Sequence, residues 1–229
     1  MKLLAHRGYS AHYPENTMEA FIQAYRRGFD GVETDVHMTK DGKLVLIHDE
    51  TIDRTSNGSG FIQDYNYKQL QDYSFSYGYP GYYPLPLLED LLVLIQGKPF
   101  VVNIELKTDV IAYPGIEEKV YQLVHELGVE KQIYYSSFSL TSVLKMQKLD
   151  PKAYVGYLME EHYEQKYQEL LKHHIRAFHP RYDFLDKQTI TTLKRHGIQI
   201  ASWTIPDFTE YQRLKDLGVD ILISNEYLR

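Results

Sequence analysis

The chain has 229 residues, of which 43% are hydrophobic and 24% are charged, as is usual for a globular domain. It has no cysteine, which excludes disulfides, thiolate zinc sites, iron–sulfur clusters and cysteine nucleophiles. Its 25 basic and 31 acidic residues give a net charge of −6, so we expect neither nucleic acid nor an anionic membrane as a partner.

No segment has the pattern of a membrane anchor. The longest apolar stretch, residues 85–95, is interrupted by Glu89 and Asp90, so we expect no stable insertion into a bilayer. The apolar residues 3–5 are too few for the core of a signal peptide, and the predicted location is therefore cytoplasmic. The sequence does not indicate an oligomeric state.

Short apolar segments alternate with amphipathic segments along the chain. A strand is predicted at residues 3–5, followed by a helix at residues 17–27 between Thr17 as N-cap and Gly28 as the stop. Further strands are expected at residues 29–36, 100–106, 132–136, 153–158, 175–179, 198–203 and 220–223. Helices are expected between the later strands, at residues 116–127, 140–149, 163–173, 187–196 and 208–217.

One more strand-like segment, residues 43–48, follows the second strand so closely that it must return antiparallel. Only Asp41 and Gly42 separate the two, whereas a parallel crossover needs a dozen or more residues. With a two-residue turn, His48 is predicted to lie directly opposite Asp35 on the same face of the hairpin.

The remaining eight strands and their helices predict an α/β fold, a closed (β/α)₈ or TIM barrel, with an open doubly wound sheet as the alternative. Residues 49–86 break the alternation with a Ser/Gly/Asn cluster and many tyrosines, which predicts a small insertion over one end of the barrel. The tyrosines either pack this loop or bind a quaternary ammonium group. No linker is visible, so residues 1–229 are predicted to form one domain.

Ionisable side chains collect near the predicted carboxyl ends of three neighbouring strands, where barrels of this type carry their active sites. They are His6, Arg7, Glu33, Asp35, Glu105 and Lys107, and the hairpin adds His48. Three carboxylates around one point repel one another unless a cation lies between them, and oxygen ligands favour Mg²⁺ or Ca²⁺. With two histidines and two basic side chains alongside, the set favours acid–base cleavage of an anionic phosphate ester, a small-molecule substrate.

A series of short motifs extends over essentially the whole chain in a fixed order. They are His6-Arg7-Gly8, Glu15-Asn16-Thr17, Glu33-x-Asp35, His48-Asp49, Arg54-Thr55, Pro86-Leu87-Leu88-Glu89, Glu105-x-Lys107, Trp203-Thr204 and Gly218-Val219-Asp220. Any one of them is weak, but the ordered set closely resembles the glycerophosphodiester phosphodiesterase family, part of the phosphatidylinositol-phospholipase-C-like TIM-barrel superfamily. The resemblance implies cleavage of a glycerophosphodiester to glycerol 3-phosphate and an alcohol.

The resemblance also implies roles for the site residues. Glu33, Asp35 and Glu105 are expected to hold one divalent cation, Mg²⁺ or Ca²⁺. His6 and His48 are expected to be the acid–base pair, and similarity to related phospholipase barrels favours His6 as the base, although the sequence leaves the order open.

Other matching residues are expected to contact the substrate or to support those that do. Arg7 is expected to bind phosphate oxygens, and Lys107 either does the same or forms an ion pair near Glu105. Trp203 either packs in the core or forms a wall against the glycerol or the head group. Glu15 is expected to pair with Arg7, and Asn16 to order its loop through backbone hydrogen bonds.

The chain departs from the family pattern at two places. Pro206 stands where the family often has Asn, and the last strand ends in Ser224-Asn225 where Thr-Asn or Thr-Asp is frequent. We expect neither to touch the metal or the histidines.

Three other functions are weighed against this prediction. A lysophospholipase D-like activity on lysophospholipids needs an apolar acyl groove or a membrane-facing patch, and no basic amphipathic helix supports one. A non-catalytic glycerophosphodiester-binding barrel should have lost a histidine or a carboxylate, and all are present. An amidohydrolase usually has several His ligands.

Overall fold

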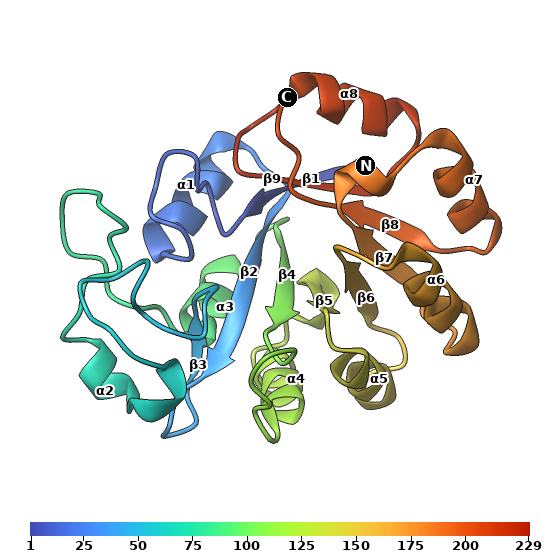
Figure 1. The fold of residues 1–229 in the computed structure, drawn as a ribbon. Coiled ribbons are helices and arrows are strands. Elements are labelled where there is room, and N and C mark those ends of the chain that lie inside the picture. The colour runs from blue at the N-terminus through green and yellow to red at the C-terminus, as the bar shows by residue number, and fades with distance from the viewer.

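Eight parallel strands form a closed barrel, because each strand pairs with the next around the ring and β9 pairs back with β1. The structure, a computed structural model, describes residues 1–229, and Figure 1 shows the strands at the centre with helices outside them. The barrel strands are β1 (Lys2–His6), β2 (Gly31–Met38), β4 (Val101–Leu106), β5 (Ile133–Ser137), β6 (Tyr154–Met159), β7 (Ala177–Pro180), β8 (Gln199–Ser202) and β9 (Ile221–Ser224). The predicted TIM barrel is confirmed.

Helices follow the strands close to their predicted positions, except that the helix at residues 88–95 was not predicted. They are α1 (Met18–Arg27), α3 (Leu88–Ile95), α4 (Ile116–Glu126), α5 (Leu140–Leu149), α6 (Tyr163–Lys172), α7 (Lys187–Arg195) and α8 (Phe208–Asp216). Thr17 caps α1 by accepting a hydrogen bond from the Ala20 N–H, and Gly28 ends the helix in a left-handed conformation, both as predicted. The apolar stretch at residues 85–95 contains α3, and no helix has the length and apolarity that a bilayer crossing needs.

Apolar side chains pack on both faces of the barrel wall, as expected for parallel strands covered by helices. Along β1, Leu3 and Ala5 join the large core cluster between strands and helices, whereas Leu4 points to the other face. There it packs with Ala201, Ile221 and Ile223 inside the barrel. The interior is thus filled with side chains below the level of the polar residues.

Strand β3 (Leu44–Leu46) pairs antiparallel with β2, as predicted, but the turn between them is one residue longer than expected. The Thr39 N–H donates a hydrogen bond to the Lys43 carbonyl, and the Thr39 carbonyl accepts one from the Gly42 N–H. Gly42 has a φ of 76°. This is a three-residue hairpin loop that closes with a left-handed residue.

The longer turn shifts the register by one residue. Val36 pairs with Leu46, and the Ile47 N–H donates to the Asp35 carbonyl. The prediction that His48 lies directly opposite Asp35 is therefore wrong, because it assumed a two-residue turn.

The insertion at residues 49–86 contains the short helix α2 (Tyr67–Leu70) and has a small core of its own. Figure 1 shows it outside the ring of strands, next to β3. The buried residues of this small core are Val45, Ile47, Ile52, Ile62, Leu70, Phe75 and Leu85. Val45 and Ile47 come from the hairpin, and the other five come from the insertion. Tyr65, Tyr67 and Tyr73 pack against this cluster, which supports the packing interpretation of the tyrosines.

Gly31 begins β2 at a point where β4 approaches closely, and a Cβ at residue 31 would lie 2.2 Å from the Val101 carbonyl oxygen. We expect Gly31→Ala to lower the free energy of unfolding by about 3 kcal/mol, because the contacted atom is backbone. Urea unfolding followed by circular dichroism measures this loss.

Gly128→Ala is the control, because a Cβ there meets open space although φ is +68°. It should cost only about 1 kcal/mol. Equal losses for the two variants would show that the approach of the two strands does not restrict residue 31.

Candidate active site

The registers of β1, β2 and β4 place the predicted residues in two adjacent layers at the carboxyl end of the barrel. His6 pairs with Glu33, and Glu33 pairs with Asn103. Two residues further along the strands, Asp35 pairs with Glu105. Because residues two apart share a face of a strand, all five side chains point into the same end of the barrel.

Glu33, Asp35 and Glu105 form a buried carboxylate cluster. One oxygen from each lies within 4.8 Å of the others, and each residue is less than a tenth exposed. Burial raises the pKa of Glu33 well above its usual range, and the charges of Asp35 and Glu105 add to the rise. Burial likewise raises the pKa of Glu105 to about 7, although Lys107 opposes it.

Asp35 behaves differently because it has cationic and hydrogen-bonding partners. Burial favours its neutral form, but Arg7, His48, Lys107 and an Asn16 hydrogen bond outweigh burial and hold the pKa of Asp35 at about 2. The cluster thus concentrates negative charge with oxygen donors only. A hard divalent cation fits this donor set.

The two basic side chains flank the carboxylate cluster. Arg7 Nε lies 3.6 Å from Asp35 Oδ2, and Lys107 Nζ donates to Glu105 Oε1 at 3.0 Å. The backbone N–H of Arg7 donates to Glu33 Oε2 at 3.0 Å. Both side chains also line the cavity, so each can contact an anion there while it pairs with a carboxylate.

His6 is held at the cavity by a residue from the last strand. Its Nδ1 lies 2.7 Å from Asn225 Oδ1, so Nδ1 donates and Nε2 is left as an acceptor, 3.9 Å from Glu33 Oε2. Burial lowers the pKa of His6 to about 4, and Arg7 adds to the effect. The expectation that Ser224-Asn225 does not touch the histidines is wrong, because the returning chain after β9 closes against β1.

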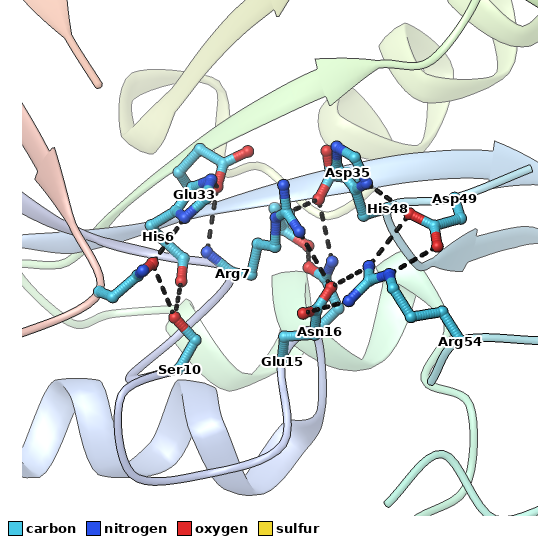
Figure 2. A network of polar contacts seen from close by, with 12 residues as sticks. His6, Arg7, Ser10, Glu15, Asn16, Glu33, Asp35, His48, Asp49 and Arg54 are labelled. Atoms are coloured by element: carbon cyan, nitrogen blue, oxygen red, sulfur yellow. Dashed lines mark hydrogen bonds and ion pairs between the residues drawn. The ribbon is translucent and has the colours of Figure 1, made fainter. Parts of the chain in front are cut away.

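His48 reaches the cavity although its predicted register is wrong. Its Nδ1 lies 2.6 Å from Asp49 Oδ1, and its Nε2 lies 3.5 Å from Lys107 Nζ. The His48 carbonyl oxygen also contacts Nε2 of the buried His37, which contacts the Tyr113 hydroxyl through Nδ1. Figure 2 shows His48 beside Asp35 and His6 beside Glu33.

Asn16 supports the site through its side chain as well as its backbone. Its N–H donates to the Arg7 carbonyl, in keeping with the predicted ordering of the loop. Its Nδ2 donates to Asp35 Oδ2 at 2.9 Å, and its Oδ1 accepts from Thr34 Oγ1 at 2.7 Å (Figure 2). The expected pairing of Glu15 with Arg7 is present, at 3.1 Å. The contact of Asn16 with Asp35 was not predicted.

These side chains surround a cavity of about 460 Å³. The predicted residues that line it are His6, Arg7, Glu33, His48, Glu105, Lys107 and Trp203. Trp203 lies edge-on to Phe138 with 5.7 Å between ring centroids, and its Nε1 donates to the His179 carbonyl. It therefore packs in the wall and also faces the cavity, and its contact with the glycerol or the head group stays a prediction.

Sequence reasoning missed eight residues of the lining, which are Glu50, Asn103, Asp109, Val110, Phe138, Leu158, Glu160 and Ile223. Asn103 is buried, donates its Nδ2 to Ser136 Oγ and has an Oδ1 without a protein partner. The alternation that places Glu105 and Lys107 on one face extends to Asn103, so this signal was available. Phe138 follows β5 in a loop and has no comparable signal.

Comparison with known proteins agrees with this geometry. Residues 6–228 match the model of the glycerophosphoryl diester phosphodiesterase family. The chain is 36% identical over 228 residues to a glycerophosphodiester phosphodiesterase of Caldanaerobacter subterraneus, covering 98% of this chain and 93% of that protein. It is 37% identical over 225 residues to one of Bacillus altitudinis, covering 96% and 92%.

Solved structures have the same fold. An Oleispira antarctica phosphodiesterase in complex with the product sn-glycerol-3-phosphate is 25% identical, with a TM-score of 0.85 over 98% of this chain and 93% of that one. A glycerophosphodiester phosphodiesterase of Agrobacterium tumefaciens is 26% identical, with a TM-score of 0.83 over 99% and 97%.

The fold and the family match define a barrel enzyme that hydrolyses phosphoric diesters. The chain belongs to the glycerophosphoryl diester phosphodiesterase family.

Removal of one charge from the carboxylate cluster should stabilise the metal-free protein. We expect Glu33→Gln to raise the melting temperature in EDTA by several degrees, because an amide is far less costly to bury and does not repel Asp35 and Glu105. The same variant should lose most of the stabilisation that wild type gains from millimolar Mg²⁺ or Ca²⁺. Differential scanning fluorimetry with and without the cation measures both effects.

Glu117→Gln is the matched control. Glu117 is also buried, but it lies outside the carboxylate cluster and accepts hydrogen bonds from Ser142 Oγ and Lys145 Nζ. This variant should lower the melting temperature and leave the response to the cation unchanged. A Glu33→Gln protein that melts below wild type in EDTA would contradict the repulsion argument.

Proposed function

We propose that this enzyme hydrolyses glycerophosphodiesters to glycerol 3-phosphate and an alcohol, with Mg²⁺ or Ca²⁺ held by Glu33, Asp35 and Glu105. The observation that carries the proposal is that two carboxylates of this buried cluster, Glu33 and Glu105, line one cavity of about 460 Å³ together with two basic side chains and two histidines. The relative crystallised with sn-glycerol-3-phosphate supports the choice of substrate. In this proposal, residues 1–229 act as one domain, and a cytoplasmic location stays a prediction.

The basic residues and the aromatic wall hold the substrate. When bound, the cation supplies positive charge that offsets the phosphate and the three carboxylates. Arg7 and Lys107 bind phosphate oxygens, since both line the cavity and both are fixed by carboxylates. Trp203 and Phe138 offer an apolar surface to the carbon skeleton of the glycerol or the head group.

The two histidines carry the proton transfers. His6 is neutral at pH 7, because its pKa lies near 4, and its Nε2 is an acceptor, so it serves as the base. His48 holds the Asp49 carboxylate at Nδ1, so in this assignment its Nε2 carries the proton that it gives to the leaving alcohol as the acid. The base acts either on the neighbouring glycerol hydroxyl, to give a cyclic phosphate that water opens, or on water directly. A cyclic phosphate detected by ³¹P NMR would favour the first route.

The first test measures release of glycerol 3-phosphate from a panel of glycerophosphodiesters, and formation of lysophosphatidate from a lysophospholipid. We expect release from the small diesters, its loss in EDTA, and its recovery with added Mg²⁺ or Ca²⁺. His6→Ala and His48→Ala should each lower kcat about 10²- to 10⁴-fold, as expected for loss of a general acid or base.

His12→Ala is the control, because His12 is half exposed, pairs with Glu226 and does not line the cavity. It should keep the activity of wild type. Formation of lysophosphatidate from the lysophospholipid, without release from the small diesters, would favour the lysophospholipase D-like alternative. Folded protein without product from any substrate would favour a binding barrel. A His48→Ala variant with full kcat would contradict the acid–base assignment.

A further inference from the structure

Arg54 has no role in the proposed chemistry, but its side chain joins two carboxylates at the edge of the active site, Asp49 and Glu15. Its guanidinium donates to Asp49 through Nε at 2.7 Å and through one terminal nitrogen at 3.0 Å. It also donates to the two Glu15 oxygens at 2.7 and 2.9 Å. All three nitrogens are engaged, and the guanidinium lies between two carboxylates that would otherwise repel each other.

Each of these carboxylates holds a residue of the cavity. Asp49 Oδ1, which accepts from Arg54, also lies 2.6 Å from His48 Nδ1. Glu15 Oε1, which accepts from Arg54, also accepts from Arg7 at 3.1 Å. Figure 2 shows the resulting chain of contacts from His48 to Arg7.

The contact with Asp49 sets the tautomer of His48. A carboxylate at Nδ1 requires hydrogen on that nitrogen and directs Nε2 toward the cavity, where Lys107 Nζ lies 3.5 Å away. Asp49 can fulfil this role only if its own carboxylate is fixed, and the two hydrogen bonds from Arg54 fix it. Lysine could not replace this geometry, because an ammonium lacks the planar fork that spans both carboxylates.

Arg54 contributes little to the stability of the fold by comparison. Its side chain is 35% exposed, and ion pairs at such positions contribute little to the free energy of unfolding. The aromatic ring of Tyr77, from the insertion, lies 5.4 Å from the guanidinium and covers it from one side. Arg54 belongs to the same insertion, so the insertion contacts the site through this side chain.

We propose that Arg54 is a positioning residue that fixes Asp49, and through it the Nδ1–H hydrogen bond and the orientation of His48, while its other edge fixes Glu15 and Arg7. This inference rests on the proposed function, in which His48 transfers a proton and Arg7 binds phosphate.

The test combines kinetics with the histidine ¹⁵N NMR spectrum. We expect Arg54→Gln to lower kcat about 10- to 100-fold, the range seen when an outer partner of a site histidine is removed. Arg54→Lys should lose nearly as much, because it keeps the charge but not the fork. Neither variant should shift the melting temperature by more than about 4 °C. When the spectrum is recorded at alkaline pH, where the ring is neutral, the His48 signals should show the Nδ1–H form in wild type and a mixture of tautomers in Arg54→Gln.

A double mutant separates positioning from a structural effect. In a His48→Ala background, Arg54→Gln should change kcat less than about twofold, since the residue that Asp49 positions is gone. The arm through Glu15 and Arg7 is still present there, and because Arg7 binds phosphate, its loss should raise KM. Arg229→Gln is the control, because Arg229 makes a similar two-pronged contact, with Asp30, and its side chain is 29% exposed. It should keep the kcat of wild type.

The outcomes distinguish this inference from the proposed function. If His48→Ala keeps full kcat, the acid–base assignment fails whatever Arg54 does. If His48→Ala loses activity but Arg54→Gln keeps the kcat and the His48 spectrum of wild type, the positioning role is wrong and the assignment stands. Full activity of Arg54→Lys, or additive losses in the double mutant, would likewise overturn the positioning role.

Discussion

Three carboxylates buried within 4.8 Å of one another are the arrangement on which the rest of this site depends. Taken alone, such a cluster is unfavourable, because burial and mutual repulsion both oppose ionisation. The protein compensates its members unequally. Asp35 receives Arg7 and an Asn16 hydrogen bond, Glu105 receives Lys107, and Glu33 receives little more than the Arg7 N–H. The charge that remains uncompensated is what makes the end of the barrel selective for a cation.

The same requirement explains the unusual backbone between β1 and α1. Arg7 and Asn16 both have a φ of 55°, in the left-handed region that residues other than glycine rarely adopt. Gly8 lies against α1 so closely that a Cβ would come within 2.7 Å of the Ala20 side chain. These conformations direct the Arg7 N–H to Glu33 and the Asn16 amide to Asp35. Each costs of order 1 kcal/mol, which the contacts to the carboxylates offset.

The sequence was sufficient for the fold and for most of the site, for a physical reason. Strands in a barrel wall are short apolar segments, and the residues at their ends alternate in direction, so Glu33, Asp35 and Glu105 could be assigned to one face before any contact was known. The hairpin register could not be assigned, because Gly42 is left-handed both in a two-residue Asp-Gly turn and at the end of the three-residue loop that is present. The contact between His6 and Asn225 joins residues 219 apart, which no local pattern reports.

The insertion and the site are best understood together. His48 and Asp49 lie between Ile47 and Ile52, and both isoleucines are buried in the small core of the insertion. The segment is pinned again where the Ile62 N–H donates to the Glu50 carbonyl. The histidine that the proposed function assigns to proton transfer therefore lies on a segment anchored at both ends by apolar burial. The insertion thus stabilises the geometry of a side chain that the barrel itself does not hold, since β3 ends at Leu46 before His48 is reached.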